Sequence, residues 1–161
     1  MGIIRRRWRV RASGSGYDIN LPDEERQLLK HLLPQLREVM TDPSDDRSRR
    51  LFPTAYADDP ERDAEYQRFM RDELVTSRLA ALDRFEETAM AKSVDEATLL
   101  GWMQSINAVR LVLGTLLDVG EDSDPSEVDQ THPNFAEFAL YGYLSALLHE
   151  IVEALSAQAG K

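Results

Sequence analysis

The sequence contains no cysteine among its 161 residues. This absence excludes disulfides, thiolate nucleophiles and cysteine-ligated metal sites together. Lysine is also scarce, because Lys30, Lys92 and Lys161 are the only lysines and the other cationic residues are all arginines. The G-x-S-x-G motif, the P-loop and the dinucleotide-binding glycine motif do not occur. We therefore expect a protein that is not an enzyme and that needs no cofactor.

Long hydrophobic runs are missing as well. No apolar run comes near the roughly 20 residues that span a bilayer, and Arg110 interrupts the best candidate. The N-terminus carries arginines without the apolar segment of a signal peptide. We expect a cytoplasmic protein with no membrane partner. Hydrophobic residues at 42% and charged residues at 30% are typical of a folded domain, so residues 1–161 are predicted to form a single domain.

Charge is distributed unevenly along the chain. The first eleven residues hold five arginines and no acid: Arg5, Arg6, Arg7, Arg9 and Arg11. Removing those 5 from the 19 basic residues leaves 14 against 29 acids, so residues 12–161 carry a formal charge of −15. Such an acidic body repels the phosphate backbone of nucleic acids, and phosphate contacts dominate nucleic-acid affinity. Direct nucleic-acid binding is therefore not expected.

Residues 1–20 are predicted to form an arginine-rich β-hairpin, with strands over 3–10 and 17–20 around a turn at 13–16. The period of two places Trp8 on the face that docks on the helices. The opposite face carries the candidate partner-binding residues Arg5, Arg7, Arg9 and Arg11. Because arginine forks pair well with carboxylates, we interpret this face as a surface for an acidic protein. A charged edge that only keeps the ribbon from aggregating is the alternative.

Residues 21–158 have the pattern of a mainly α protein: a bundle of about five helices around a central helix over 94–119. Ser93 and Glu96 have the spacing of a capping box at the start of this helix. Gly120 is predicted to be its left-handed C-cap. From 109 to 119 apolar residues lie on every side of the helix, so we expect other helices to enclose this part.

The flanking segments follow the same reasoning. Pro22 is predicted to open a helix that Pro34 kinks. The wide apolar stripe of this helix is predicted to consist of Leu28, Leu29, Leu32, Leu33, Leu36, Val39 and Met40. Residues 41–59 form a long, partly mobile loop, whose Leu51, Phe52 and Tyr56 anchor it on the core or on a partner. Helical pattern runs from 60 or 61 to 92 with a break or bend at 71–73. Pro133 opens the last helix, whose buried side is predicted to be Phe135, Phe138, Leu140, Leu144, Leu147, Leu148, Ile151, Val152 and Leu155.

Arg110 interrupts an apolar helix face, and a buried guanidinium needs acceptors. We predict that it pairs with a carboxylate or with helix-end carbonyls, with Glu150 and Glu153 as the leading partners; a ligand-binding role is the alternative. His149 lies four residues before Glu153, a metal-ligand spacing, but the motif H-E-x-x-H is not completed, so no metal site is predicted. The glycines at 114 and 142 are predicted to mark a close crossing of helices.

Several segments resemble a known family. The segments GWMQSINAVRLVLGTLLDVG (101–120) and HPNFAEFALYGYLSALLHEIVEAL (132–155) are similar to the C-terminal half of the actinobacterial oxidative-stress regulator AosR family, earlier classed as a domain of unknown function. RLFPTAYADDPERDAEYQRFM (50–70) is similar to its middle, and the ribbon with LPDEERQLLKHLLPQL (21–36) to its start. The most specific part is the series Trp102, Asn107, Arg110, Leu111, Leu113, Gly114 and Thr115.

This resemblance implies a transcription-regulatory protein that acts through a protein partner, such as an RNA polymerase sigma factor, and not by catalysis. Redox sensing in the family is attributed to cysteines, and this chain has none. Cysteine-based sensing is therefore not possible here. Two alternatives stay open at this point: a structural or assembly module that forms a homodimer, and a direct DNA binder that uses the arginine ribbon.

Overall fold

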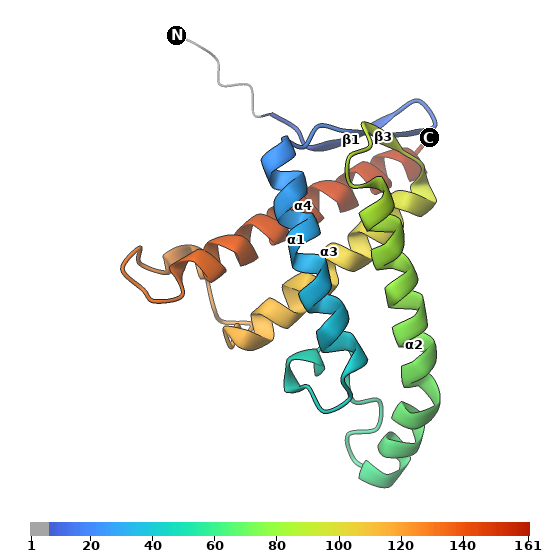
Figure 1. The fold of residues 1–161 in the computed structure, drawn as a ribbon, viewed down its shortest axis with the longest axis vertical. Helices are drawn as coiled ribbons and strands as arrows, with labels where there is room; N and C mark the ends of the chain where they lie inside the picture. Colours follow the sequence, from blue (N-terminus) through green and yellow to red (C-terminus); the bar gives the residue numbers. More distant parts are fainter. Residues whose placement is uncertain (1–6) are drawn as a thin grey trace.

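Four α-helices and a small antiparallel sheet make up the computed structural model, which describes residues 7–161 (Figure 1). The helices are α1 (Asp23–Thr41), α2 (Pro60–Thr88), α3 (Glu96–Leu116) and α4 (Phe135–Ala159). The sheet consists of β1 (Val10–Ser13), β2 (Gly16–Ile19) and β3 (Ser93–Val94), in that order. Two short 3-10 turns lie at Asp46–Ser48 and Pro125–Glu127. The predicted mainly α bundle with an N-terminal ribbon is confirmed.

β1 and β2 form the predicted hairpin, but β1 begins at Val10 and not at residue 3. The turn pairs Ser13 with Gly16, and this register places Val10 opposite Ile19. Gly14 has a φ of 58° at the turn, a conformation that glycine adopts without strain. β2 cannot continue past the Pro22 that opens α1, because proline has no amide hydrogen. Residues 7 and 8 therefore have no opposing strand; residues 3–6 of the predicted strand lie outside the described residues.

β2 also pairs with β3, a strand that the sequence pattern did not predict. Ser93 lies opposite Asp18 in this sheet, so the predicted capping box is wrong. Asp95 caps α3 instead, and its carboxylate accepts a hydrogen bond from the amide of Thr98 at 2.8 Å. The sheet packs on the helices through a buried face that alternates with exposed residues as predicted, and this face consists of Val10, Tyr17, Ile19 and Val94.

α1 begins after Pro22 with three acids in its first turn, which complement the positive end of the helix dipole. The helix continues through Pro34 to Thr41. Its buried stripe agrees with the predicted one at Leu29, Leu33, Leu36, Val39 and Met40. Leu28 was predicted to belong to the same stripe, but it is 41% exposed.

The segment between α1 and α2 is anchored on the core. Of the two predicted alternatives, the core or a partner, the structure shows the first. Leu51 and Phe52 are buried. Arg78 of α2 donates to the carbonyl of Leu51 at 2.9 Å, and the guanidinium of Arg71 lies 4.1 Å from the centre of the Phe52 ring. These two side chains are therefore not available to a partner.

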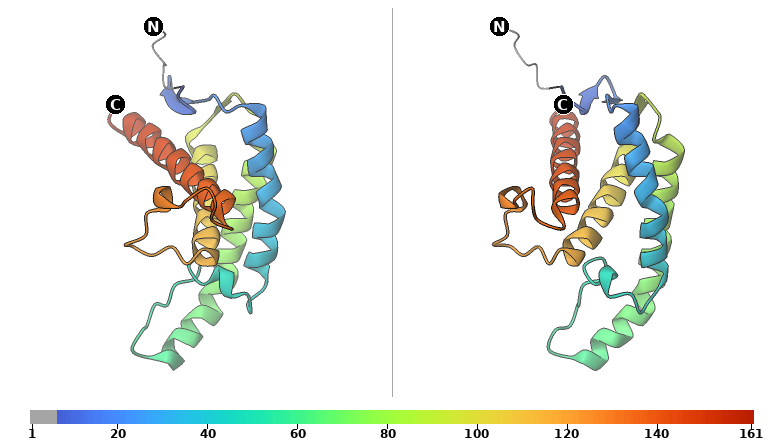
Figure 2. Two further views of the ribbon diagram at one scale, coloured as in Figure 1. Left: turned by 90° about the vertical axis from the view of Figure 1, so that its left-hand side faces the viewer. Right: turned by 60° about the vertical axis from the view of Figure 1, so that its left-hand side comes forward.

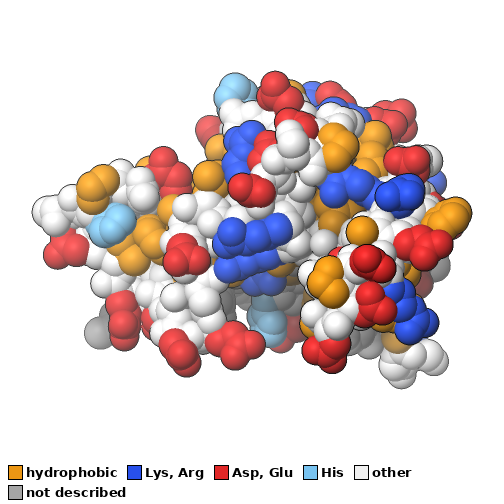
Figure 3. All heavy atoms as spheres, turned by 90° about the horizontal axis from the view of Figure 1, so that it is seen from below, with side chains coloured by type: hydrophobic (Ala, Val, Ile, Leu, Met, Phe, Trp, Pro, Cys, Tyr) orange, Lys and Arg blue, Asp and Glu red, His pale blue; other side chains and the backbone are white. Residues whose placement is uncertain are grey.

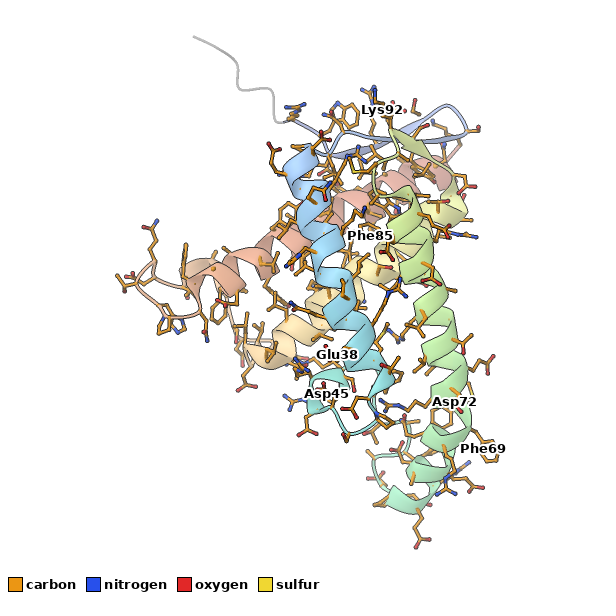
Figure 4. The ribbon with its side chains drawn as sticks, in the orientation of Figure 1. Glu38, Asp45, Phe69, Asp72, Phe85 and Lys92 are labelled. Carbon is orange, nitrogen blue, oxygen red and sulfur yellow. The ribbon has the colours of Figure 1, made fainter. Side chains whose placement is uncertain are left out.

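α2 is one unbroken helix of 29 residues, so the predicted break at 71–73 is wrong. Because α2 is continuous, the described residues contain four α-helices, where about five were predicted. The side chain of Asp59 caps α2 by accepting from the amide of Arg62. The N-terminal end of the helix projects beyond the bundle, and Phe69 points away from it, 73% exposed (Figure 4). Phe85, near the other end, is buried between the helices.

α3 is the central helix, and it lies between α2 and α4 while also contacting α1 (Figures 1 and 2). Its first half is enclosed, with Leu99, Trp102 and Ile106 almost fully buried. The expectation that residues 109–119 are surrounded is wrong toward the C-terminus, because Leu116 is 58% exposed. The predicted cap at Gly120 is also wrong. Asp118 adopts the left-handed conformation with a φ of 52°.

The helix end at α3 has the bonds of a Schellman motif. The amide of Val119 donates to the carbonyl of Gly114, and the amide of Asp118 donates to the carbonyl of Thr115. Gly114 itself is closely covered, since a Cβ there would lie 2.9 Å from Arg50 Nη1 and 3.1 Å from a ring carbon of Tyr141. The neighbours are side chains and not another backbone, and Gly142 has open space around it. The predicted backbone contact at Gly114 or Gly142 is therefore wrong, but α4 does approach α3 closely at Gly114, through the ring of Tyr141.

α4 packs on α3 and β1 with one face and leaves part of its apolar surface uncovered. Leu144, Leu147 and Ile151 are buried as predicted, but Phe135 is 36% and Val152 43% exposed. By length and composition alone, α4 is long and apolar enough to cross a membrane. No such segment was expected from the sequence. In the structure, 22% of this apolar stretch is buried. A helix that packs against other proteins has the same composition. α4 is thus an apolar helix with one free side.

Candidate functional site

The arginine ribbon does not present a row of free arginines. Arg5 lies outside the described residues. Arg7 is exposed. The guanidinium of Arg11 pairs with Asp18 at 3.3 Å and lies 4.0 Å from the centre of the Trp8 ring. Arg9, in contrast, is turned into the molecule.

Arg9 forms a forked ion pair with Glu25 of α1. Its Nε lies 2.8 Å from Glu25 Oε2 and its Nη2 lies 3.0 Å from Oε1. The hydroxyl of Tyr143 on α4 donates to Glu25 Oε2 at 2.7 Å. Hydrogen bonds from Arg9 lower the pKa of Glu25, and burial together with the Glu25 acceptor raises the pKa of Tyr143. The side chain of Arg9 thus joins the ribbon to two helices.

A second carboxylate holds the same point of the chain. Glu150 Oε1 on α4 accepts hydrogen bonds from the backbone amides of Arg9 and Val10. Together Glu25 and Glu150 clamp the start of the ribbon from two helices, and we call this arrangement the ribbon clamp. Of the four predicted partner-binding arginines, the structure leaves Arg7 and Arg11 with exposed side chains, while Arg9 has a structural role.

We expect the ribbon clamp to weaken in acid through Glu25. Because the folded-state pKa of Glu25 lies below its unfolded value, its contribution is complete above about pH 4.3 and is lost as pH falls through the lowered pKa. The variant Glu25→Gln should lose about 1 kcal/mol of unfolding free energy at pH 7. The difference between wild type and variant, measured by urea unfolding, should shrink as the pH falls below about 4.3.

A matched control is Asp18→Asn, which removes an exposed partner of the ribbon and leaves the clamp intact. A difference between wild type and Glu25→Gln that stayed constant from pH 7 to pH 3 would contradict the role given to the Glu25 carboxylate.

The predicted partners of Arg110 are wrong. Glu150 belongs to the ribbon clamp, and Glu153 Oε1 lies 3.1 Å from His149 Nε2 on the exposed side of α4. Arg110 of α3 faces α4 at Ser145, which precedes Glu150 and Glu153 along that helix. Arg110 therefore donates to Ser145 Oγ at 3.4 Å, and it also donates to Asn107 Oδ1 at 3.4 Å. Its Nε is buried without an acceptor. Arg110 is half-buried beside neutral groups, and no carboxylate of residues 7–161 lies within ion-pair distance.

The other members of the α3 series have structural roles. Trp102 is fully buried, donates through Nε1 to Thr88 Oγ1 at 2.8 Å, and packs edge-on against Phe85 with ring centres 4.7 Å apart. Gly114 makes room for Arg50 and Tyr141. Thr115 Oγ1 donates to the Leu111 carbonyl one turn back. Arg110 is the member of this series whose buried Nε has no acceptor.

Sequence reasoning missed the most deeply buried charge of the described residues. Arg26 follows three acids in the first turn of α1, a pattern typical of a solvated helix start, yet it is 5% exposed and donates to four backbone carbonyls. Nothing in the local pattern distinguishes it from an exposed arginine. No group of three or more potential metal ligands occurs in residues 7–161.

An apolar depression runs between α1, α3 and the start of α4, and we call it the α1–α4 groove. It consists of two adjoining hollows that share Leu140. The first includes Leu32, Val112 and Leu116, and the second includes Leu28, Glu137 and Tyr143. Leu28 and Leu116 are among the more exposed large hydrophobic residues of the described chain. The depression is lined mostly by apolar side chains, with Arg47 in the first hollow and Glu137 in the second, so it can hold an apolar side chain or helix face.

Fold and surface together define a mainly α protein whose polar groups hold its own architecture and whose open features are suited to binding. The family described as "Domain of unknown function (DUF2017)" matches residues 5–155, and the chain belongs to this family. It is 26% identical to a protein of Mycobacterium leprae (strain TN) named "Putative oxidative stress regulator AosR", over 97% of this chain and 91% of that protein. That name supports a regulatory role. No solved structure matches the chain.

Proposed function

We propose that this chain regulates transcription in the cytoplasm by binding a protein partner, with an RNA polymerase sigma factor as the leading candidate, and that it is not an enzyme. The observation that carries the proposal is the similarity, over nearly the whole chain, to a relative named as an oxidative stress regulator. The lack of cysteine means that an oxidant signal would reach this chain through a partner or through methionine, of which Met90 is 48% exposed.

The arginine ribbon remains our candidate for contact with acidic surfaces of that partner. Among the predicted arginines within residues 7–161, Arg7 and Arg11 are the candidates for this contact, because Arg9 is held in the ribbon clamp. Arg5 lies outside the described residues and stays a candidate. An exposed guanidinium pairs with a partner carboxylate in a forked geometry. Arg9 is therefore excluded from any variant that is meant to test binding while leaving the fold unchanged.

The experiment is capture of sigma factors from native cell extract by the tagged chain, followed by titration with the purified sigma factor. The double variant Arg7→Ala with Arg11→Ala should weaken binding several-fold, and its unfolding free energy should stay within about 0.5 kcal/mol of wild type. The matched control is Arg49→Ala with Arg68→Ala, two exposed arginines outside the ribbon. Absence of any sigma factor or polymerase subunit among the captured proteins would refute the proposal.

Direct DNA binding is the weaker candidate. Residues 111–160 contain nine acids and no lysine or arginine, so one side of the molecule strongly repels a phosphate backbone. Tight duplex binding at physiological salt that the Arg7 and Arg11 substitutions abolish would favour the DNA-binding alternative over a protein partner.

A further inference from the structure

The α1–α4 groove is an apolar surface that nothing in residues 7–161 covers. Leu28 on α1 and Leu116 at the end of α3 are 41% and 58% exposed, and both line it. Leu140 of α4 joins its two hollows. Exposed leucines gathered in a depression cost solvation free energy in the isolated chain, and such surfaces mark sites where another apolar element binds.

The surroundings of the groove are acidic. Glu137 lines it directly, Glu24 is exposed one turn before Leu28, and Asp118 and Glu121 follow Leu116. The chain from 111 to 160 supplies nine acids and no lysine or arginine. Seen from below, the end of the molecule with the loop after α3 and the start of α4 shows acidic, hydrophobic and histidine side chains, and lysine or arginine side chains gather beside it at the centre of the view (Figure 3). Arg47 also lines the first hollow, where its guanidinium pairs with Asp45 at 2.7 Å. The groove therefore combines an apolar floor with a rim on which acids outnumber this one paired arginine.

We propose that the α1–α4 groove binds an amphipathic helix of a partner protein, with leucine-like anchors at helical spacing and lysines or arginines on its flanks. A helix satisfies its own backbone hydrogen bonds, so it can lie on an apolar floor without leaving polar groups unpaired. Basic flanks match the acidic rim and raise the association rate. The inference deepens the proposed function, on which it rests, by naming the surface and the chemistry of the partner segment.

A second copy of this chain fits the groove less well. A symmetric dimer places the same patch on both subunits, so it would bring the acids of residues 111–160 against their own copies. Like charges across an interface are unfavourable. A cationic partner segment meets the same apolar floor without that repulsion, which is why the occupant is assigned to another protein.

The test uses the full chain and a fluorescent peptide of about 15 residues, roughly four helical turns, built from leucine and lysine with the leucines on one helical face. Anisotropy at physiological salt should show saturable binding. The same peptide with glutamate in place of lysine should not bind. A leucine–lysine peptide of equal composition but alternating pattern, which cannot form the apolar face of a helix, should bind at least about tenfold more weakly, a difference of about 1.4 kcal/mol.

The decisive variant is Leu28→Glu with Leu116→Glu. It adds two negative charges, so mere attraction between charges would strengthen binding, whereas loss of the apolar floor should weaken it at least about tenfold. Phe69→Glu is the matched control, because Phe69 is 73% exposed on the projecting end of α2 and away from the groove. Both variants should keep the wild-type melting temperature within a few degrees, since the replaced side chains are exposed.

Three outcomes would overturn the inference. The double variant could bind the helical peptide as tightly as wild type. Sedimentation could show a dimer that the same double variant abolishes, which would assign the groove to a second copy. Deletion of residues 1–6 could increase peptide affinity many-fold, which would assign the groove to the chain's own N-terminus. Intact sigma factor capture by the double variant would leave the proposed function standing while refuting the groove as its surface.

Discussion

Replacing Arg26 by methionine should destabilise the protein by about 3–5 kcal/mol, a large part of the stability of an ordinary domain. Arg26 is 5% exposed, and no carboxylate of residues 7–161 lies within ion-pair distance of its guanidinium. Its donors reach four backbone carbonyls, at distances of 2.6–3.3 Å: those of Ile19, Leu21, Ala89 and Ala91. Methionine fills similar space without donors, so several buried carbonyls would lose their hydrogen bonds at roughly 1–3 kcal/mol each.

The consequence reaches three parts of the fold, because these carbonyls belong to β2, the connection from β2 to α1 and the connection from α2 to β3. Urea unfolding measures the effect. Arg37→Ala is the matched control: Arg37 lies on the same helix and pairs with Asp83 and Glu86 at the surface, so its loss should cost about 0–1 kcal/mol. Equal effects of the two substitutions would contradict the role of the buried carbonyls.

Trp102→Ala should lower the unfolding free energy by about 3–5 kcal/mol, because it opens a cavity in the centre of the core. Trp102 is fully buried between α2 and α3, where it contacts Phe85 and donates to Thr88. The residue belongs to the series that carries the family resemblance, so this outcome would assign that part of the series to stability and not to partner contact.

The control for Trp102 uses smaller changes. Trp102→Phe keeps an aromatic ring beside Phe85 and removes the hydrogen bond, and Thr88→Val removes the acceptor alone. In a double-mutant cycle the pair should show a coupling of about 1 kcal/mol. Partner binding by Trp102→Phe should match wild type. A loss of binding in a stably folded Trp102→Phe variant would instead place the tryptophan at a functional surface.

The helices were predictable because a few turns of sequence are enough to show the helical spacing of their apolar residues. The stripe of α1 and the buried leucines of α4 recur at helical spacing, and this period depends only on the geometry of the element. The sequence predicted less well which of several suitable neighbouring residues caps a helix. Ser93 and Asp95 are both suitable caps, and only the pairing of Ser93 with Asp18 in the sheet selected Asp95. The helix α2 likewise crosses a shift in apolar phase without a break, since half of it is exposed.

The candidate site was predicted in part. The sequence places arginines at alternate positions of the ribbon, and the structure confirms the alternation in the described strands through Val10, Tyr17 and Ile19. Which arginine is free depends on residues far away along the chain, because Glu25 and Glu150 select Arg9. The same limit explains the error at Arg110, whose acceptors depend on where α4 crosses α3.

By itself, the sequence determined the class of the fold, the absence of thiol chemistry, and the separation of a basic end from an acidic body, because these follow from composition and from periods of two and 3.6 residues. Only the tertiary structure decided which charged side chains make structural contacts within the fold and which apolar faces remain exposed. A pattern shows that one side of α4 is apolar, but covering that side requires a neighbour, and the packing of α1 and α3 reaches only part of it. Arg26 and the α1–α4 groove are therefore visible only when elements distant in the chain are brought together.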